Sequence, residues 1–180
     1  MIVDIHSHIY PRSYINLLAE RTAIPRIEIK DDGEHFVIFP NEDALAGGTR
    51  SIGPEYFDLN EKLVFMDKHG ISKTVVSLGN PWIDFLSRQE APAWASKIND
   101  EITEITEEYD KFAGLAVLPL QDVRAAVEEM KRIESLPHIL GVSLGTRPNG
   151  VHLDDPYLNP FWEQAEAPQL PVYIHPHYAI

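Results

Sequence analysis

Residues 2–8 read Ile-Val-Asp-Ile-His-Ser-His, an apolar, β-branched run that ends in two histidines spaced two positions apart. Such a run is typical of a buried strand with both faces covered. Side chains on a strand alternate between its faces, so His6 and His8 point the same way with their Cβ atoms about 6.5–7 Å apart. Two imidazoles at this spacing can converge on one divalent metal ion, whose bonds to nitrogen are about 2.0–2.1 Å long. The pair alone fits two surface histidines at a strand end equally well.

A second pair of histidines follows another short apolar run near the other end of the sequence. His175 and His177 come after residues 170–174, Leu-Pro-Val-Tyr-Ile, which also predict a buried strand. Metal binding explains why two separate strands end in histidine, whereas packing does not. His175 directly follows the apolar run and is the preferred third ligand, with His177 as the alternative or as a residue lining the pocket. Asp4 shares the face of the first two histidines, either as an acceptor that orients an imidazole or as a polar residue near the site.

The composition is that of an acidic globular chain without cysteine. Its 180 residues are enough for one sizeable core, and we expect a single domain over residues 1–180. The net charge of −13 argues against nucleic acid and against an anionic membrane surface as partners. The absence of cysteine excludes disulfides, thiolate metal sites and cysteine nucleophiles. Without a long apolar run or a leader before the first strand, the expected location is cytoplasmic.

The order of the predicted elements is that of an α/β barrel. Short apolar runs predict strands at residues 2–6, 73–78, 112–117, 139–144 and 171–175. Amphipathic patterns predict helices at residues 56–69, 91–109, 121–133 and 157–167. A small β-hairpin over residues 27–29 and 36–39 interrupts the first crossover, and a glycine-rich loop over residues 44–53 follows it. Alternating strands and helices imply parallel strands, so we predict a (β/α)8 TIM-barrel type of fold, of which this chain supplies about the first five βα units.

Five strands do not close a barrel of this kind, whose chemistry takes place at the C-terminal ends of its strands. We therefore expect a fragment, a natural truncation or a shorter open sheet. The sheet edges and apolar faces that five units leave uncovered favour association, so a homo-oligomer is expected as well.

The motifs resemble those of one enzyme superfamily along the whole chain. Residues 3–11, Val-Asp-Ile-His-Ser-His-Ile-Tyr-Pro, are similar to the D-x-H-x-H-x-x-P signature that opens the amidohydrolase superfamily. Segments at residues 66–71, 75–82, 141–146, 153–156 and 172–178 resemble the branch that contains aminocarboxymuconate semialdehyde decarboxylase and the aromatic acid decarboxylases. Within this branch, residues 77–82 and the stretch from 10 to 25 are most similar to the isoorotate decarboxylases.

The resemblance implies a divalent metal, zinc or manganese, held by His6, His8 and His175. That family also uses an aspartate ligand at the end of strand eight and a histidine after strand six. Neither has a counterpart among the matching segments, so the catalytic residues are expected beyond Ile180 and their identity is unknown.

Two further residues are candidates for binding the substrate. Arg50 lies in the glycine-rich loop, where a guanidinium can grip a carboxylate through two parallel hydrogen bonds; the alternative is a solvated arginine. Asn80 follows the second strand of the barrel, where its amide can donate to and accept from a ring amide or hydroxyl; the alternative is a turn residue before Pro81. Trp82 and Phe85 either wall an aromatic pocket or pack in the loop.

Together these features predict a metal-dependent, non-oxidative decarboxylase, a carboxy-lyase, that acts on an aromatic or pyrimidine-type carboxylic acid. The expected partner is this small-molecule acid, with no organic cofactor, because no glycine-rich dinucleotide fingerprint follows a strand. One alternative is a hydrolase that uses the same metal to activate water against a lactone or an amide. A second alternative is an inactive fragment that binds metal without turnover.

Overall fold

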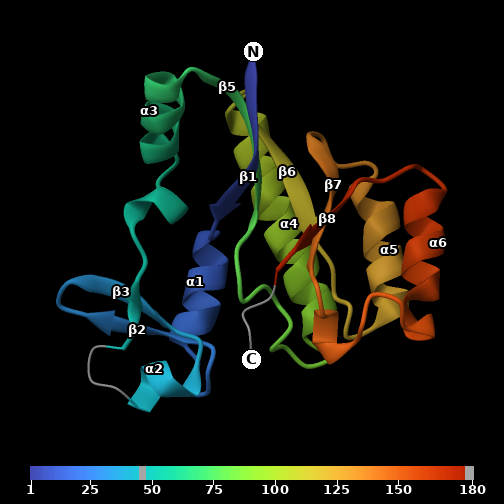
Figure 1. Ribbon diagram of the computed structural model, residues 1–180, viewed down its shortest axis with the longest axis horizontal. Coiled ribbons are helices and arrows are strands. Elements are labelled where there is room, and N and C mark those ends of the chain that lie inside the picture. The colour runs from blue at the N-terminus through green and yellow to red at the C-terminus, as the bar shows by residue number, and fades with distance from the viewer. Residues whose placement is uncertain (45–47, 177–180) are drawn as a thin grey trace. The chain divides into compact units, whose positions relative to one another are not determined.

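The computed structural model describes residues 1–44 and 48–176 (Figure 1). These residues belong to two compact units. The first unit contains residues 1–8 and the chain from residue 71 onward, and the second contains residues 9–70. His177 and part of the glycine-rich loop therefore lie outside the described residues. Among the helices of the described ranges, none combines the length and the apolar character that crossing a membrane requires.

The first unit is built on a five-stranded parallel sheet that curls as the first part of a (β/α)8 barrel, which confirms the predicted fold. Its strand order follows the chain, as right-handed crossovers between parallel strands produce. All five predicted strands are present, with ends that differ from the prediction by at most three residues. The strands are β1 (Ile2–Ile9), β5 (Ile71–Leu78), β6 (Phe112–Val117), β7 (Ile139–Gly145) and β8 (Val172–His175).

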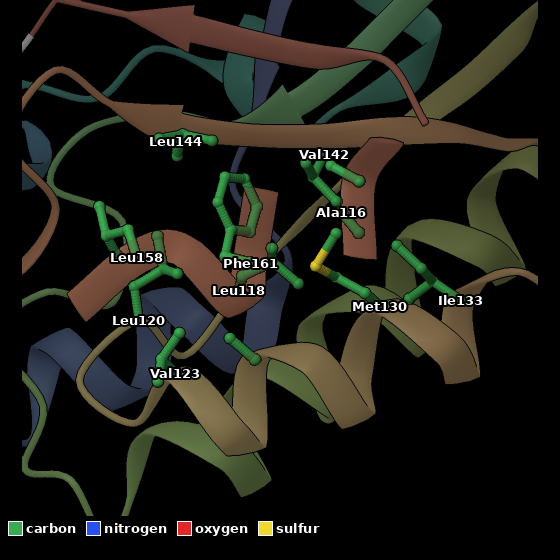
Figure 2. Close-up of a cluster of buried hydrophobic side chains, with 12 residues drawn as sticks. Ala116, Leu118, Leu120, Val123, Met130, Ile133, Val142, Leu144, Leu158 and Phe161 are labelled. Carbon is green, nitrogen blue, oxygen red and sulfur yellow. The ribbon is translucent and has the colours of Figure 1, made fainter. Parts of the chain in front are cut away.

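Three helices of this unit accompany the sheet: α4 (Ala91–Glu108), α5 (Val123–Ile133) and α6 (Asn159–Glu166). Their apolar faces were predicted, and α5 and α6 bury them against β6 and β7 in one cluster (Figure 2). Phe161 of α6 is fully buried in this cluster beside Met130 of α5 and Val142 of β7. Short 3-10 turns, η2 (Pro148–Gly150) and η3 (Pro156–Leu158), precede α6. These contacts pack α5 and α6 against the sheet.

The two outermost strands correct one prediction. Ile5 of β1 is 62% exposed and Ile174 of β8 is 45% exposed, so neither strand is buried on both faces. Both strands lie at edges of the sheet, and each has a neighbouring strand on one side only among the described residues. An apolar run predicts a strand, but it does not distinguish an edge strand from a central one.

The second unit contains a three-stranded antiparallel sheet with the order β2-β3-β4. The predicted hairpin is confirmed as β2 (Arg26–Lys30) and β3 (Gly33–Val37), and the structure adds β4 (Arg50–Ser51) to it. The predicted helix before the barrel's second strand is α3 (Leu59–His69), which ends at Gly70 in the left-handed conformation with φ +67°. The other elements are α1 (Arg12–Ala19), α2 (Pro40–Ala44) and η1 (Pro54–Tyr56).

Candidate metal centre

Three histidine side chains of the first unit converge at the C-terminal ends of β1 and β8. The Nε2 atom of His6 lies 3.1 Å from Nε2 of His8 and 3.1 Å from Nε2 of His175. One ring nitrogen from each of the three lies within 4.8 Å of the others. In a flat five-stranded sheet the two outer strands would be about 19 Å apart, because neighbouring strands are spaced by about 4.8 Å. The curl of the sheet is therefore what brings the two strand ends together.

The distances between the nitrogens fit a shared metal ion. With bonds of about 2.0–2.1 Å, ligand nitrogens lie about 3.3 Å apart around a tetrahedral ion and about 2.9 Å apart at neighbouring octahedral positions. The two observed separations of 3.1 Å lie between these values. A single proton on Nε2 of His6 can serve only one of its two neighbours, whereas a cation satisfies all three nitrogens at once. The donor set thus suits a divalent cation better than it suits mutual hydrogen bonding.

Contacts of the remaining ring nitrogens orient two of the three rings. Nδ1 of His175 lies 2.9 Å from the backbone carbonyl oxygen of Pro176, so Nδ1 carries the proton and donates it. Nε2 of His175 then offers a lone pair toward the other two rings. Nδ1 of His8 lies 3.2 Å from Oγ of Ser77, a residue that is 2% exposed. Such contacts orient an imidazole and fix which nitrogen meets the metal.

Aromatic rings surround the three histidines. The ring centroid of Trp82 lies 5.6 Å from that of His175, edge to face, and Trp82 is 2% exposed. Tyr173 of β8 approaches His6 with the centroids 5.5 Å apart. Asp4 accepts a hydrogen bond from the backbone N–H of His6 at 3.0 Å, so its carboxylate contacts the backbone of β1 beside the cluster. His6 is exposed, and His8 and His175 are partly buried, so solvent reaches the cluster.

The structure brings together the three predicted metal ligands, and the two predicted substrate-binding residues belong to different units. Asn80 belongs to the first unit, where it is partly buried two residues beyond the end of β5. Arg50 belongs to β4 of the second unit, and its Nε donates to Oε1 of Glu42 at 2.8 Å. Roles for Arg50 and Asn80 in substrate binding remain predictions.

Two residues beside the histidines were missed by the sequence reasoning. Ser77 contacts His8 from β5, and Tyr173 contacts His6 from β8. The alternation of side chains along a strand carried the signal for Tyr173, because it lies two positions before His175 and so shares its face. For Ser77 no such signal exists in the sequence, since the pairing of β1 with β5 decides which residue meets His8.

The chain belongs to the amidohydrolase family, whose model matches residues 3–180. It is 25% identical over 97% of its length to 2-amino-3-carboxymuconate-6-semialdehyde decarboxylase of Dictyostelium discoideum, of which it covers 48%. It is 33% identical over 79% of its length to gamma-resorcylate decarboxylase of Rhodococcus jostii, of which it covers 49%. The chain therefore spans about half the length of these relatives.

A solved structure supports the same family at the level of the fold. IDCase of Metarhizium anisopliae in its apo form superposes with a TM-score of 0.91 at 30% identity. The superposition covers the whole of this chain and 51% of IDCase. The expected resemblance to the aromatic acid decarboxylase branch, and within it to isoorotate decarboxylase, is confirmed.

Proposed function

We propose that the protein is a metal-dependent, non-oxidative decarboxylase of an aromatic or heteroaromatic carboxylic acid, with a divalent ion held by His6, His8 and His175. The convergence of three Nε2 atoms at two strand ends is the observation that carries this proposal. The names of the relatives support the reaction and the class of substrate. A further solved structure, of a 2,6-dihydroxybenzoate decarboxylase in complex with 2,6-dihydroxybenzoate, is 25% identical to this chain.

In this proposal some residues of the chain bind the ion and others orient the acid. The ion supplies a Lewis acid that stabilises negative charge on the substrate's oxygens. Arg50 pairs with the substrate's carboxylate, and Asn80 hydrogen-bonds a ring amide or hydroxyl. The relatives are about twice as long as this chain. During decarboxylation a proton is added to the ring carbon, and we assign its donor to the part of the relatives' barrel that this chain does not match.

Zinc and manganese are both compatible with three imidazole ligands, so we propose that the site binds one of these two ions. We further infer a cytoplasmic homo-oligomer without a nucleic-acid or membrane partner. The net charge of −13 supports the last point, and the exposed apolar residues of β1 support self-association.

Hydrolysis of a lactone or an amide is the rival reaction, because three imidazoles around a metal can also activate water. The test uses the full-length protein as its gene encodes it, loaded with zinc or manganese. It is supplied with isoorotate, 2,6-dihydroxybenzoate, a lactone and an amide, and loss of the acid and release of carbon dioxide are followed. Metal-dependent release of carbon dioxide from one of the acids is the expected result. Hydrolysis without decarboxylation would favour the rival, and metal binding without any turnover would favour an inactive chain.

A further inference from the structure

The connection between β5 and α4, residues 79–90, brings Trp82 to the histidine cluster. The connection and both of its flanking elements belong to the first unit. The ring of Trp82 meets that of His175 edge to face, with the centroids 5.6 Å apart and the planes at 76°. The Nδ1 atom of His175 contacts the carbonyl oxygen of the next residue in the chain, Pro176. Trp82 is therefore a contact that reaches the third candidate ligand from a different segment.

The backbone of Trp82 has an uncommon conformation. Its φ is +53°, in the left-handed region, which a bulky residue rarely adopts. Such a conformation persists only where the surrounding contacts enforce it. The N–H of Trp82 donates to the carbonyl oxygen of Gly79 at 3.1 Å, and the N–H of Leu86 donates to that of Ile83 at 3.0 Å. These two hydrogen bonds lie inside the connection, so they shape it without attaching it to its neighbours.

Gln121 attaches the connection to the segment between β6 and α5. Its Nε2 donates to the carbonyl oxygens of Ile83 and Leu86 at 2.5 and 3.3 Å, and an amide nitrogen carries two protons for two such bonds. Gln121 is 8% exposed, and a hydrogen bond is stronger in buried surroundings than in water. Ile83 directly follows Trp82 in the chain. Gln121 therefore holds the connection at the residue next to Trp82.

Gln121 is itself held at its backbone. The hydroxyl of Tyr157 donates to the carbonyl oxygen of Gln121 at 3.2 Å and accepts from the N–H of Val123 at 3.1 Å. Tyr157 belongs to η3, and Val123 is the first residue of α5. The side chain that reaches the connection thus starts from a backbone that two other elements keep in place.

The other end of the Gln121 amide argues for positioning. Its Oε1 atom is buried and has no hydrogen-bond partner among residues 1–44 and 48–176. A buried acceptor without a partner costs free energy of folding, which offsets part of what the two donated bonds contribute. Holding the connection in place therefore explains a glutamine at this position better than stability does.

We propose that Gln121 is a positioning residue of the metal centre, which holds Trp82 against His175 and so keeps the His175 ring directed at the ion. This inference rests on the proposed function, in which His175 is one of the three ligands. Gln121 acts through residues 79–90 and does not touch the ion itself. A ligand whose ring is held before the ion arrives loses less conformational freedom on binding, so the site binds the ion more tightly.

The substitution Gln121→Met tests this role, because methionine has a similar length and cannot donate. The affinity of the full-length protein for zinc and for manganese is measured by competition with a metal-binding dye. Tryptophan emission is recorded as each ion is added, since an ion on His175 changes the electrostatic surroundings of the indole beside it. The variant Trp82→Leu identifies which part of the emission change comes from Trp82.

We expect Gln121→Met to weaken metal binding about two- to tenfold, which is the range that loss of an aromatic contact gives. The Trp82 part of the emission change should decrease as well, while the circular dichroism spectrum stays unchanged. In a Trp82→Leu background, Gln121→Met should cause no additional loss of affinity, because Gln121 acts through Trp82.

Arg88→Gln is the matched control. Arg88 links the same two segments, because its Nε donates to Oδ2 of Asp122 at 2.8 Å, but its side chain is 63% exposed. An exposed ion pair contributes little, so metal affinity and emission should both stay unchanged in this variant.

Three results would each overturn the positioning role while leaving the metal centre in place. They are an unchanged affinity and emission in Gln121→Met, an equal loss in Arg88→Gln, and an additional loss in the Trp82→Leu background. If the unsubstituted protein binds neither ion, the metal centre itself fails, and the positioning role of Gln121 fails with it.

Discussion

The side chain of Ser77 contacts His8 in the histidine cluster, where Oγ of Ser77 lies 3.2 Å from Nδ1 of His8. Ser77 is buried on β5 and His8 lies on β1, so the contact ties an edge strand to its neighbour at the level of the candidate metal centre. A partner on the second nitrogen of a ligating imidazole holds the ring in place and sets the lone pair that faces the ion.

Ser77→Ala should therefore weaken metal binding. Loss of such a partner typically reduces metal affinity about 10–100-fold, and we expect a decrease of that size in a competition titration with a metal-binding dye. Ser143→Ala is the matched control, because Ser143 is also a buried strand serine of this unit and its hydroxyl has no hydrogen-bond partner among the described residues. Equal affinities in the two variants would contradict a role for Ser77 in orienting His8.

Gly141 determines how closely β7 approaches β8, the strand that carries His175. A Cβ atom added at Gly141 would lie 2.3 Å from the backbone oxygen of Pro171, which directly precedes β8. Backbone cannot move aside as a flexible side chain can, so Gly141→Ala should lower the free energy of unfolding by about 1–3 kcal/mol. It should also weaken metal binding, because His175 moves with its strand. Denaturant unfolding and metal titration test this, and a variant as stable as Ser143→Ala would show that the strands separate at no cost.

Asp122 begins α5 by accepting the backbone N–H groups of Arg124 and Ala125 at 3.1 and 3.4 Å. Asp122→Ala removes this cap and should lower the free energy of unfolding by about 0.5–2 kcal/mol. Asp122→Asn should lose much less at neutral pH, since asparagine is an equally good cap. Chemical unfolding followed by circular dichroism compares the two. An asparagine variant as unstable as the alanine variant would mean that the cap is not what Asp122 provides.

The same residue predicts a dependence of stability on pH. The hydrogen bond from Arg88 brings the pKa of Asp122 below its ordinary value of 3.8, although burial partly opposes this shift. A carboxyl whose pKa is lower in the folded than in the unfolded state stabilises the fold above its ordinary pKa. That contribution is lost as the pH falls through the lower, folded pKa. Unfolding measured from pH 6 downward should show a steeper loss of stability for the unsubstituted protein than for Asp122→Asn, and parallel curves would contradict the shift.

The sequence predicted those parts of the fold that depend on local pattern. Strand β6 was predicted at the residues where it occurs, because its apolar run is bounded by charged residues and by Pro119. Gly70 was expected to end α3, and a left-handed glycine ends it. The three histidines were chosen from their position at strand ends, and the structure brings them together.

What the sequence did not predict depends on contacts between distant residues. β4 is two residues long and depends on its pairing with His35 and Phe36 of β3. The exposure of Ile5 follows from the place of β1 at the edge of the sheet. The ion pair between Glu42 and Arg50 joins residues with no regular spacing, so no periodicity could indicate it. Helix α1 was missed although its buried residues, Tyr14, Ile15 and Leu18, have helical spacing.

The metal content of the purified, full-length protein tests the central claim most directly. Inductively coupled plasma mass spectrometry should find one divalent ion per chain in the unsubstituted protein. The control variant His152→Ala, which removes an exposed histidine of the same unit, should bind the same amount. His6→Ala, His8→Ala and His175→Ala should each lose most of this metal while keeping their circular dichroism spectra, because each removes one of three converging nitrogens. An unchanged metal content in a variant that lacks all three histidines would contradict the account.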